Sequence, residues 1–367
     1  MPPAAVPIAP VGPVSAATML YRENGLLHLV AIVKATFAFA HHGAMGIAPA
    51  ERMYTREVHR MNNPTRSIIA TSDLVPRLPG ADVVLVGQAH APGGSATNAM
   101  ARLAVGRGDT VLLDKSIHVV GDRKGAEIKP FRSIPLVYEK TYGGPGYREN
   151  PLGTGVLSGD PPPNLLDPRG GEGAIGFAPI SRSWPARSAL VAPEVRAGLD
   201  GAFAEIPPGF DYRYFHAAPA DQRLAHLIGD EWVVLENLHA THGALHLVLP
   251  GAQAMVRVLG REGARVFSLR ADTLRIDTDA ERCTLVWRNG FRVQEAELGA
   301  MRLFGGVQVG DAPIPWPEEA PPPGQVAAAQ DRAAAKGAWG TMVLEDRPAG
   351  SGFNSTMEVS DEDIESV

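Results

Sequence analysis

Glycine and proline interrupt this sequence so often that it favours short strands and long loops over helices. Forty Gly and 32 Pro make up about a fifth of the 367 residues, whereas together they average about 12% of a globular sequence. Proline ends regular elements and glycine favours turns, so breaks are expected throughout the chain. The apolar fraction of 45% is ordinary, and a chain of this length can still bury a sizeable core.

Runs rich in β-branched and aromatic residues predict the strands. The clearest are LLHLVAIVKATFAFA at 26–40 and ADVVLVGQAH at 81–90. Further strands are expected at residues 99–106, 110–120, 133–140, 231–238, 244–249, 253–259, 264–270, 273–278 and 282–288. One helix is expected near 219–228. The pattern predicts a mainly β fold, an antiparallel sandwich or open barrel with long Gly/Pro-rich loops and few short helices.

Domain organisation follows from where this pattern stops. Region 141–219 is crowded with Gly and Pro but keeps aromatic residues, which disordered segments lack. Residues 1–311 are therefore expected to form one β-rich domain, or two β subdomains at about 1–140 and 220–311 joined by the loop-rich region. Residues 312–367 are expected to be a Pro/Ala-rich linker and an acidic disordered tail.

The net charge of −6 belongs to the end of the chain. Residues 345–367 hold seven of the 40 acidic residues and one of the 34 basic residues, which leaves 33 of each sign elsewhere. A neutral body gives no electrostatic basis for nucleic-acid binding, because phosphate neutralisation dominates that affinity.

An apolar island, WGTMVL at residues 339–344, interrupts the tail. One interpretation is a docking motif that adds a strand to a partner's sheet edge through Trp339, Met342 and Leu344. The other interpretation is a last strand of the body, tethered by the linker.

Composition also limits the compartment. The single cysteine, Cys283, excludes a disulfide framework and a cysteine-rich zinc site. The first residues, MPPAAVP, lack the basic and apolar regions of a signal peptide. Segment 26–40 is too short and too polar for a membrane helix. We expect a cytoplasmic protein without membrane insertion.

Two motifs suggest cofactors, but their context opposes this. His239, His242 and His246 resemble a metal site, yet a strand–turn–strand around Gly243 would point the three rings to different faces. The loop in 87–94 lacks the residues that complete a phosphate-binding loop. We expect no metal, no cofactor and no catalytic residue.

Polar residues embedded in Gly/Pro-rich loops stand out instead. They could form a recognition surface, because loops on a rigid scaffold carry binding. They could equally satisfy the backbone groups of the loops themselves. Each interpretation is expected to hold for about half of them. The candidate binding residues of these loops are Asp73, Arg77, Asp82, Asp122, Arg123, Tyr142, Asn150, Trp184, Arg187 and Asp211. Lys34, His90 and Gln222, which belong to the motifs given next, complete the candidate set.

These residues lie in motifs spread in order over about 20–290. The motifs are VKATF (33–37), DLVPRLPGADVVLVGQAHAPG (73–93), VGDR (120–123), YEKTYGG (138–144), NPLGTG (150–155), PNLL (163–166), GFAPISRSWPAR (176–187), FDYRYF (210–215), APADQ (218–222), DTLRID (272–277) and VWR (286–288). With them the chain resembles a domain-of-unknown-function family encoded in type VI secretion clusters of Gram-negative bacteria. The part after residue 311 lies outside the resemblance.

The resemblance implies a non-enzymatic adaptor or chaperone of the type VI secretion system. Its partner would be an effector, or the spike or spike-tip protein onto which the effector is loaded. Two alternatives stay open. One is a hydrolase that uses loop-borne groups such as Asp122, Asp211 or His90. The other is a carbohydrate- or small-ligand-binding β module, in which surface Trp and Tyr of 142–215 line a groove.

Overall fold

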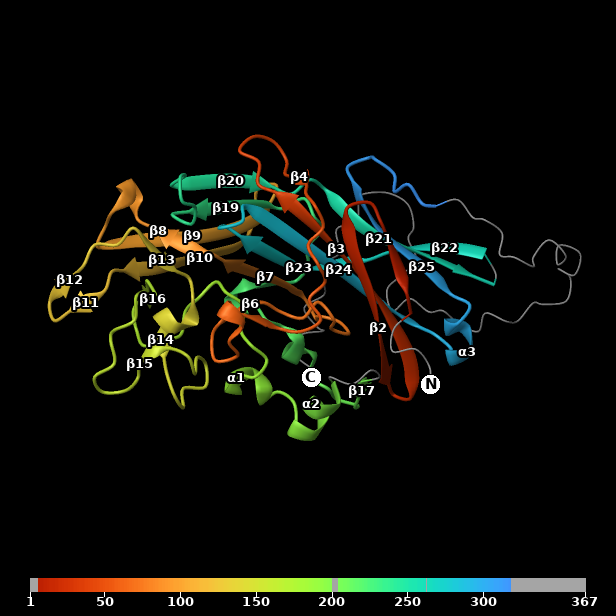
Figure 1. Cartoon of the computed structure of the whole chain (residues 1–367), viewed down its shortest axis with the longest axis horizontal. Helices are drawn as coiled ribbons and strands as arrows, with labels where there is room; N and C mark the ends of the chain where they lie inside the picture. Colours follow the sequence, from red (N-terminus) through yellow and green to blue (C-terminus); the bar gives the residue numbers. More distant parts are fainter. Residues whose placement is uncertain (1–5, 200–203, 262, 318–367) are drawn as a thin grey trace, which may run out of the picture.

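Three main β-sheets form an elongated molecule (Figure 1). The computed structural model describes residues 6–199, 204–261 and 263–317. Strands far outnumber helices, so the predicted mainly β class is confirmed. Within the described residues no sheet closes into a barrel.

The central sheet has the strand order β17-β2-β3-β24-β23-β7-β18, and β4 also pairs with β3. The long pairing of β3 with β24 runs antiparallel, whereas β7 pairs with β23 and β2 pairs with β17 in parallel. The sheet is therefore mixed. Its strands are β2 (Val14–Glu23), β3 (Leu26–Ala38), β4 (Gly46–Ile47), β7 (Ala81–Val86), β17 (Ala204–Ile206), β18 (Arg223–Leu224), β23 (Arg270–Asp277) and β24 (Arg282–Arg292).

Two further sheets flank the central one (Figure 1). The hairpin sheet is antiparallel with the order β16-β10-β9-β19-β20, and the terminal sheet has the order β1-β25-β21-β22 with β1 parallel to β25. Their strands are β9 (Asn98–Arg107), β10 (Thr110–Val120), β16 (Leu165–Leu166), β19 (Trp232–Glu236), β20 (Ala244–Val248), β1 (Ile8–Val11), β21 (Ala252–Gly260), β22 (Gly263–Ser268) and β25 (Arg302–Val309).

Short elements decorate the connections. Four two-stranded ribbons pair β5 (Val58–His59) with β6 (Ile68–Ala70), β8 (Gln88–His90) with β13 (Ser133–Pro135), β11 (Arg123–Lys124) with β12 (Glu127–Ile128), and β14 (Tyr142–Gly143) with β15 (Thr154–Gly155). The helices are α1 (Pro185–Ser188), α2 (Pro193–Leu199) and α3 (Glu295–Leu298), with 3-10 turns η1 (Arg60–Asn62), η2 (Pro92–Gly94), η3 (Tyr138–Lys140), η4 (Tyr212–Phe215) and η5 (Ala220–Gln222). None of the described helices is long and apolar enough to span a membrane.

The helix predicted near 219–228 is wrong in extent. Only the single turn η5 forms there, and the chain then extends into β18. The buried Gln222 side chain donates to the carbonyls of Val83 and Phe177, which draws this segment against β7. Pairing with the sheet thus overrides the weak local preference for a helix.

One cluster of buried side chains draws on all three sheets, with members such as Leu29, Leu103 and Val256. Strand β3 is buried on both of its faces. Leu29 and Val33 enter this core, whereas Val30 and Ile32 face a second cluster on the opposite side of the sheet. Burial on both faces explains why 26–40 is a continuous apolar run without in/out alternation.

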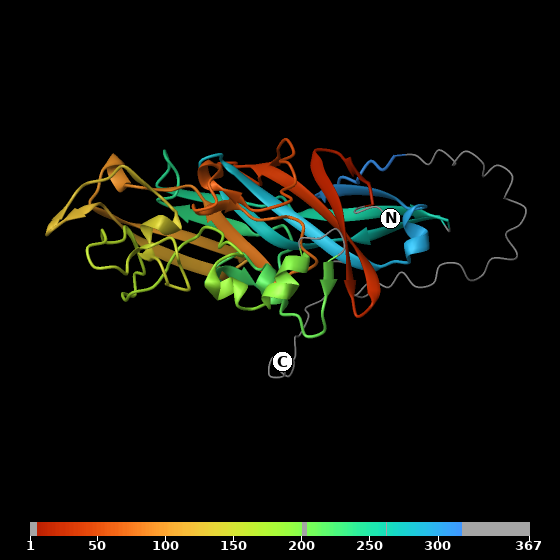
Figure 2. The same cartoon turned by 60° about the horizontal axis from the view of Figure 1, so that its bottom comes forward.

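Irregular segments cover that opposite face of the central sheet. We call the described parts of 48–80 and 137–222 the loop layer. Figures 1 and 2 both show α1, α2 and the neighbouring loops along one side of the sheets. Side chains of the loop layer, including Met53, Leu74 and Phe210, pack against the second cluster. The layer therefore belongs to the packed body.

The chain after β25 continues across the terminal sheet. Ile314 is buried and lies against Gly306, and Arg257 donates to the carbonyl of Pro317. Packing therefore extends past residue 311. The acidic tail and its docking candidates Trp339, Met342 and Leu344 lie outside the described residues.

Candidate functional site

A buried ionic network fixes the first part of the loop layer. Lys34 of β3 donates to Asp73 and to the carbonyl of Arg52, each at 3.0 Å, and lies 3.3 Å from Glu51. Arg275 of β23 places one guanidinium nitrogen 2.9 and 3.0 Å from the two Glu51 oxygens. Burial alone would raise the pKa of Glu51, but Arg275 and Lys34 lower it to about 2. The network brings together two sequence candidates, Lys34 and Asp73.

Asp82 anchors the last part of the loop layer to β7. One carboxylate oxygen lies 2.6 Å from His216 Nδ1, and the other accepts the backbone N–H groups of Ala217 and Ala218 at 2.6 and 3.0 Å. Burial opposes ionisation, but these contacts outweigh it and hold the pKa of Asp82 below its usual value. Both Asp82 and His216 are buried.

Arg187 and Trp184 fix the middle part of the loop layer, around α1. The buried Arg187 guanidinium donates to the carbonyls of Tyr214 and Phe215 at 2.9 and 3.2 Å, and also to Ile180. Trp184 packs edge-on against Tyr138, with ring centroids 4.8 Å apart. Burial lowers the pKa of Arg187 to about 10, so the guanidinium stays charged at neutral pH.

Asn150 and Gln222 also fix the loop layer, through hydrogen bonds of their side-chain amides. The Asn150 amide donates to the Tyr138 carbonyl at 2.9 Å and to Thr141 Oγ1 at 2.7 Å. The Gln222 carbonyl oxygen accepts from Lys115 Nζ at 2.9 Å. Both amides are fully buried. The backbone carbonyls that they bond lie away from water and would otherwise lack partners.

The more exposed candidates also contact the loops around them. Their contacts are Arg77 over the Tyr212 ring at 3.9 Å, Asp122 to Asn164 at 3.0 Å, Arg123 to the Pro163 carbonyl at 2.7 Å, Tyr142 to Glu172 at 2.9 Å, and Asp211 to the Arg213 N–H at 2.9 Å. These contacts support the structural interpretation. Binding of a partner by any of the candidates stays a prediction.

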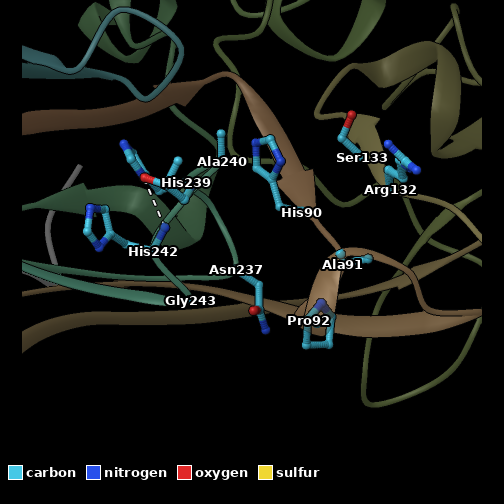
Figure 3. Close-up of a pocket in the computed structure, with 13 residues that line it drawn as sticks. His90, Ala91, Pro92, Arg132, Ser133, Asn237, His239, Ala240, His242 and Gly243 are labelled. Carbon is cyan, nitrogen blue, oxygen red and sulfur yellow. Dashed lines mark hydrogen bonds between the residues drawn. The ribbon is translucent and has the colours of Figure 1, made fainter.

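His90 differs from the other candidates because its ring lines a pocket of about 460 Å³. The pocket opens between the η2 turn, the start of β13 and the β19–β20 turn. Figure 3 places His90 between Arg132 on one side and His239 and His242 on the other. Burial lowers the pKa of the His90 ring.

Backbone hydrogen bonds join the three pocket walls. The N–H of His90 donates to the carbonyl of Asn237, and the N–H of Ala91 donates to the carbonyl of Arg132, both at 2.8 Å. Gly93 and Gly94 have φ angles of 65° and 84°, a left-handed backbone that favours glycine, and this lets the η2 turn fold back tightly. The pocket is thus built into the scaffold.

The histidines of the pocket have distinct partners. His239 Nδ1 accepts the His242 N–H at 3.2 Å, so Nε2 carries the proton and donates to Glu281 at 2.9 Å. His246 lies on β20 and stacks on Trp232 instead of entering the pocket. Among residues 6–199, 204–261 and 263–317, no three His, Cys, Asp or Glu are placed to hold a metal ion.

The proposed hydrolase residues lie on separate elements. Asp122 follows β10, Asp211 precedes η4 and His90 ends β8, and no hydrogen bond or ion pair joins any two of them in the described structure. The pocket lining also contains no Trp or Tyr. It is not the groove of Trp and Tyr from 142–215 that the carbohydrate-module alternative requires, so that alternative stays a prediction.

Sequence reasoning missed the meeting of His90 with His239 and His242. It considered the latter pair only with His246, along one segment of chain. The contact depends on tertiary pairing of β8 with the β19–β20 turn, which no local spacing encodes. It also missed Glu51, Arg275 and His216 as anchors, although the candidates Lys34, Asp73 and Asp82 are their partners.

Comparison with known proteins places most of this architecture in one family. Residues 24–288 match the family described as an uncharacterized protein conserved in bacteria (DUF2169). The matched range contains the whole loop layer and the residues of the pocket. No curated protein and no solved structure matches the chain.

Proposed function

The chain belongs to the bacterial family DUF2169, and from this premise we propose that it is a non-enzymatic adaptor that binds another protein through its loop layer. The proposed partner is an effector or a spike-tip protein of a type VI secretion system, held in the cytoplasm for loading. The resemblance of the ordered motifs to that accessory family supports this choice of partner.

The single observation that carries the proposal is the way the loop layer is fixed. Buried charged and amide groups tie its irregular segments to the central sheet, and Glu57 joins the two segments by accepting from Ser181 and from the Arg182 N–H at 2.6 and 2.7 Å. A surface ordered during folding loses little further entropy when a partner binds. Loops on such a scaffold are well suited to recognition.

The loop layer also presents apolar side chains to solvent. Met61 is 89% exposed and Leu157 is 52% exposed. An effector that exposes apolar surface before secretion would bury it against such groups. We therefore expect a partner to contact Met61 and Leu157.

Co-expression with a neighbouring effector or spike-tip gene tests the proposal. The full chain is expected to co-purify with that protein and to raise its soluble yield. Because apolar hot-spot side chains contribute about 1–2 kcal/mol each, M61D combined with L157D should weaken binding at least about tenfold. Val111 is 55% exposed on β10, outside the loop layer, so V111D is the matched control.

Titration calorimetry with the purified pair gives the affinities. An unchanged soluble yield together with no co-purification would count against the adaptor. Equal weakening by V111D and by the double variant would show that the loop layer is not the binding surface.

A further inference from the structure

The histidine-lined pocket has a lining that suits a negatively charged ligand. It contains the three imidazoles of His90, His239 and His242 and the guanidinium of Arg132, but no Asp or Glu. Arg132 is exposed, and its side chain makes no hydrogen bond or ion pair with any other described residue. A permanent positive charge therefore faces the cavity without a counterion from the described chain.

Two acidic groups interact with the histidines from outside the pocket lining. Glu281 accepts from His239 Nε2, and Asp279 acts electrostatically on His90 from the same β23–β24 connection. A carboxylate that accepts from an imidazole in this way orients the ring. Both carboxylates leave the faces of the rings that line the cavity available to a ligand.

We propose that this pocket binds an oxyanion, a carboxylate or phosphate group, with Arg132 as the principal charged contact and His90 and His242 as hydrogen-bond donors. Guanidinium presents paired N–H groups whose spacing matches two oxygens of such an anion. The volume of about 460 Å³ admits a small molecule or a single charged side chain. The inference goes beyond the adaptor function and stands whether or not the loop layer binds a partner.

Binding is expected to be coupled to proton uptake. His90 is half-buried and its pKa is lowered by burial, so the free ring is largely neutral at pH 7.5. A bound anion favours the imidazolium, so the pKa of the His90 ring rises on binding and the ring takes up a proton as the pH falls. The other groups in this environment are His239, His242, His41 beside His242 at 4.6 Å, Arg132, Asp279 and Glu281.

The test uses full-length protein titrated with inorganic phosphate and, separately, with malonate. Calorimetry at pH 6.0 and 7.5 gives the affinities, and NMR of ¹³C-labelled histidine gives the pKa of the His90 ring. We expect a raised His90 pKa in the bound state. Phosphate itself gains a proton between pH 7.5 and 6.0, so the His90 pKa, and not the change in affinity, measures the coupling. Loss of one charge-assisted contact in R132Q should weaken binding about tenfold.

Arg66 is exposed in the loop layer and absent from the pocket lining, so R66Q is the matched control and should bind like the wild type. Binding of phosphate alone would identify a phosphoryl ligand, and binding of malonate alone would identify a carboxylate. Absence of binding by both anions at pH 6.0 would overturn the proposal. Equal affinities for wild type and R132Q would overturn it as well.

Discussion

Glu51 of the loop layer pairs with several basic side chains of the central sheet. Its carboxylate contacts Lys34, Arg275 and, at 3.4 Å, Arg282, and it accepts from the Tyr54 hydroxyl at 2.7 Å. Charges buried in this way are tolerated because each has an opposite partner. Removing Glu51 leaves Lys34 with Asp73 and Arg275 with Asp277, but both buried cations lose their shared carboxylate. That loss costs more than the intact network contributes.

Glu51→Gln is therefore expected to lower the free energy of unfolding at pH 7 by about 3 kcal/mol. The pKa of Glu51 is about 2 in the folded chain against 4.5 as its ordinary value. The contribution of ionised Glu51 to the free energy of unfolding is thus present above about pH 4.5 and is lost as the pH falls towards 2. Urea unfolding between pH 7 and pH 2.5 measures both effects, and E51Q should show a shallower loss of stability below pH 4.5.

Glu127→Gln provides the control, because Glu127 is exposed on β12. Its free energy of unfolding should stay within about 0.5 kcal/mol of the wild type at every pH. If E51Q and the wild type lost stability with the same slope below pH 4.5, the network would not depend on ionised Glu51.

At the residue scale, the sequence allowed some of the buried polar residues that fix the loop layer to be selected, but not their interaction partners. Asp73 was selected as a polar residue in a Gly/Pro-rich loop, and Lys34 as part of the VKATF motif. Glu51 was not, although it is the centre of the network. Its partner Arg275 lies 224 residues away, and local composition carries no information about such a contact.

Among the structural elements, the turn after β10 shows why the VGDR motif at 120–123 requires glycine. Gly121 separates β10 from β11, and its N–H donates to the carbonyl of Thr97 at 2.9 Å. A Cβ atom added at Gly121 would lie 1.9 Å from the carbonyl oxygen of Lys129. Because that obstacle is backbone, a side chain here must displace the segment after β12.

Gly121→Ala is expected to destabilise the protein by about 1–3 kcal/mol, the range for forced overpacking. Gly299→Ala is the matched control, because a Cβ there meets open space and the residue has an ordinary helical backbone. Thermal melting measures stability, and hydrogen exchange should show loss of protection in β11 and β12. Equal melting temperatures for the two variants would mean that the contact with Lys129 relaxes freely.

Strand positions were the most predictable part of the fold. Segments 26–40, 81–90 and 110–120 contain β3, β7 and β10, because burial imposes a local pattern on them. Which strands pair with one another was harder to predict from the sequence. The parallel pairing of β7 with β23 joins distant parts of the chain, and its register depends on the packed layers on both sides.

Across the whole molecule, one core connects the three sheets. Leu103 of the hairpin sheet, Val33 of the central sheet and Val256 of the terminal sheet belong to the same cluster of buried side chains. Shared burial makes the stability of each sheet depend on its neighbours. The sequence left one domain or two β subdomains open, and this cluster favours joint unfolding.

Calorimetry is therefore expected to show one cooperative unfolding transition for the packed body. Truncations at opposite ends of the core, L103A and V256A, should both move that transition to lower temperature. Each should cost about 1–4 kcal/mol, according to how far the cavity collapses. Two resolved transitions, each sensitive to only one of the variants, would instead establish independent subdomains.

The parallel pairing of β1 with β25 gives the molecule a mechanical property. Ile8 lies opposite Leu303 and Val11 opposite Gly306, so the incoming end of the first strand and the outgoing end of the last lie at opposite ends of this short pair. Tension applied between the two chain termini would load its hydrogen bonds together in shear, without peeling them one at a time. Resistance to pulling would then depend on how fast this clamp ruptures under force, even where its equilibrium stability is modest.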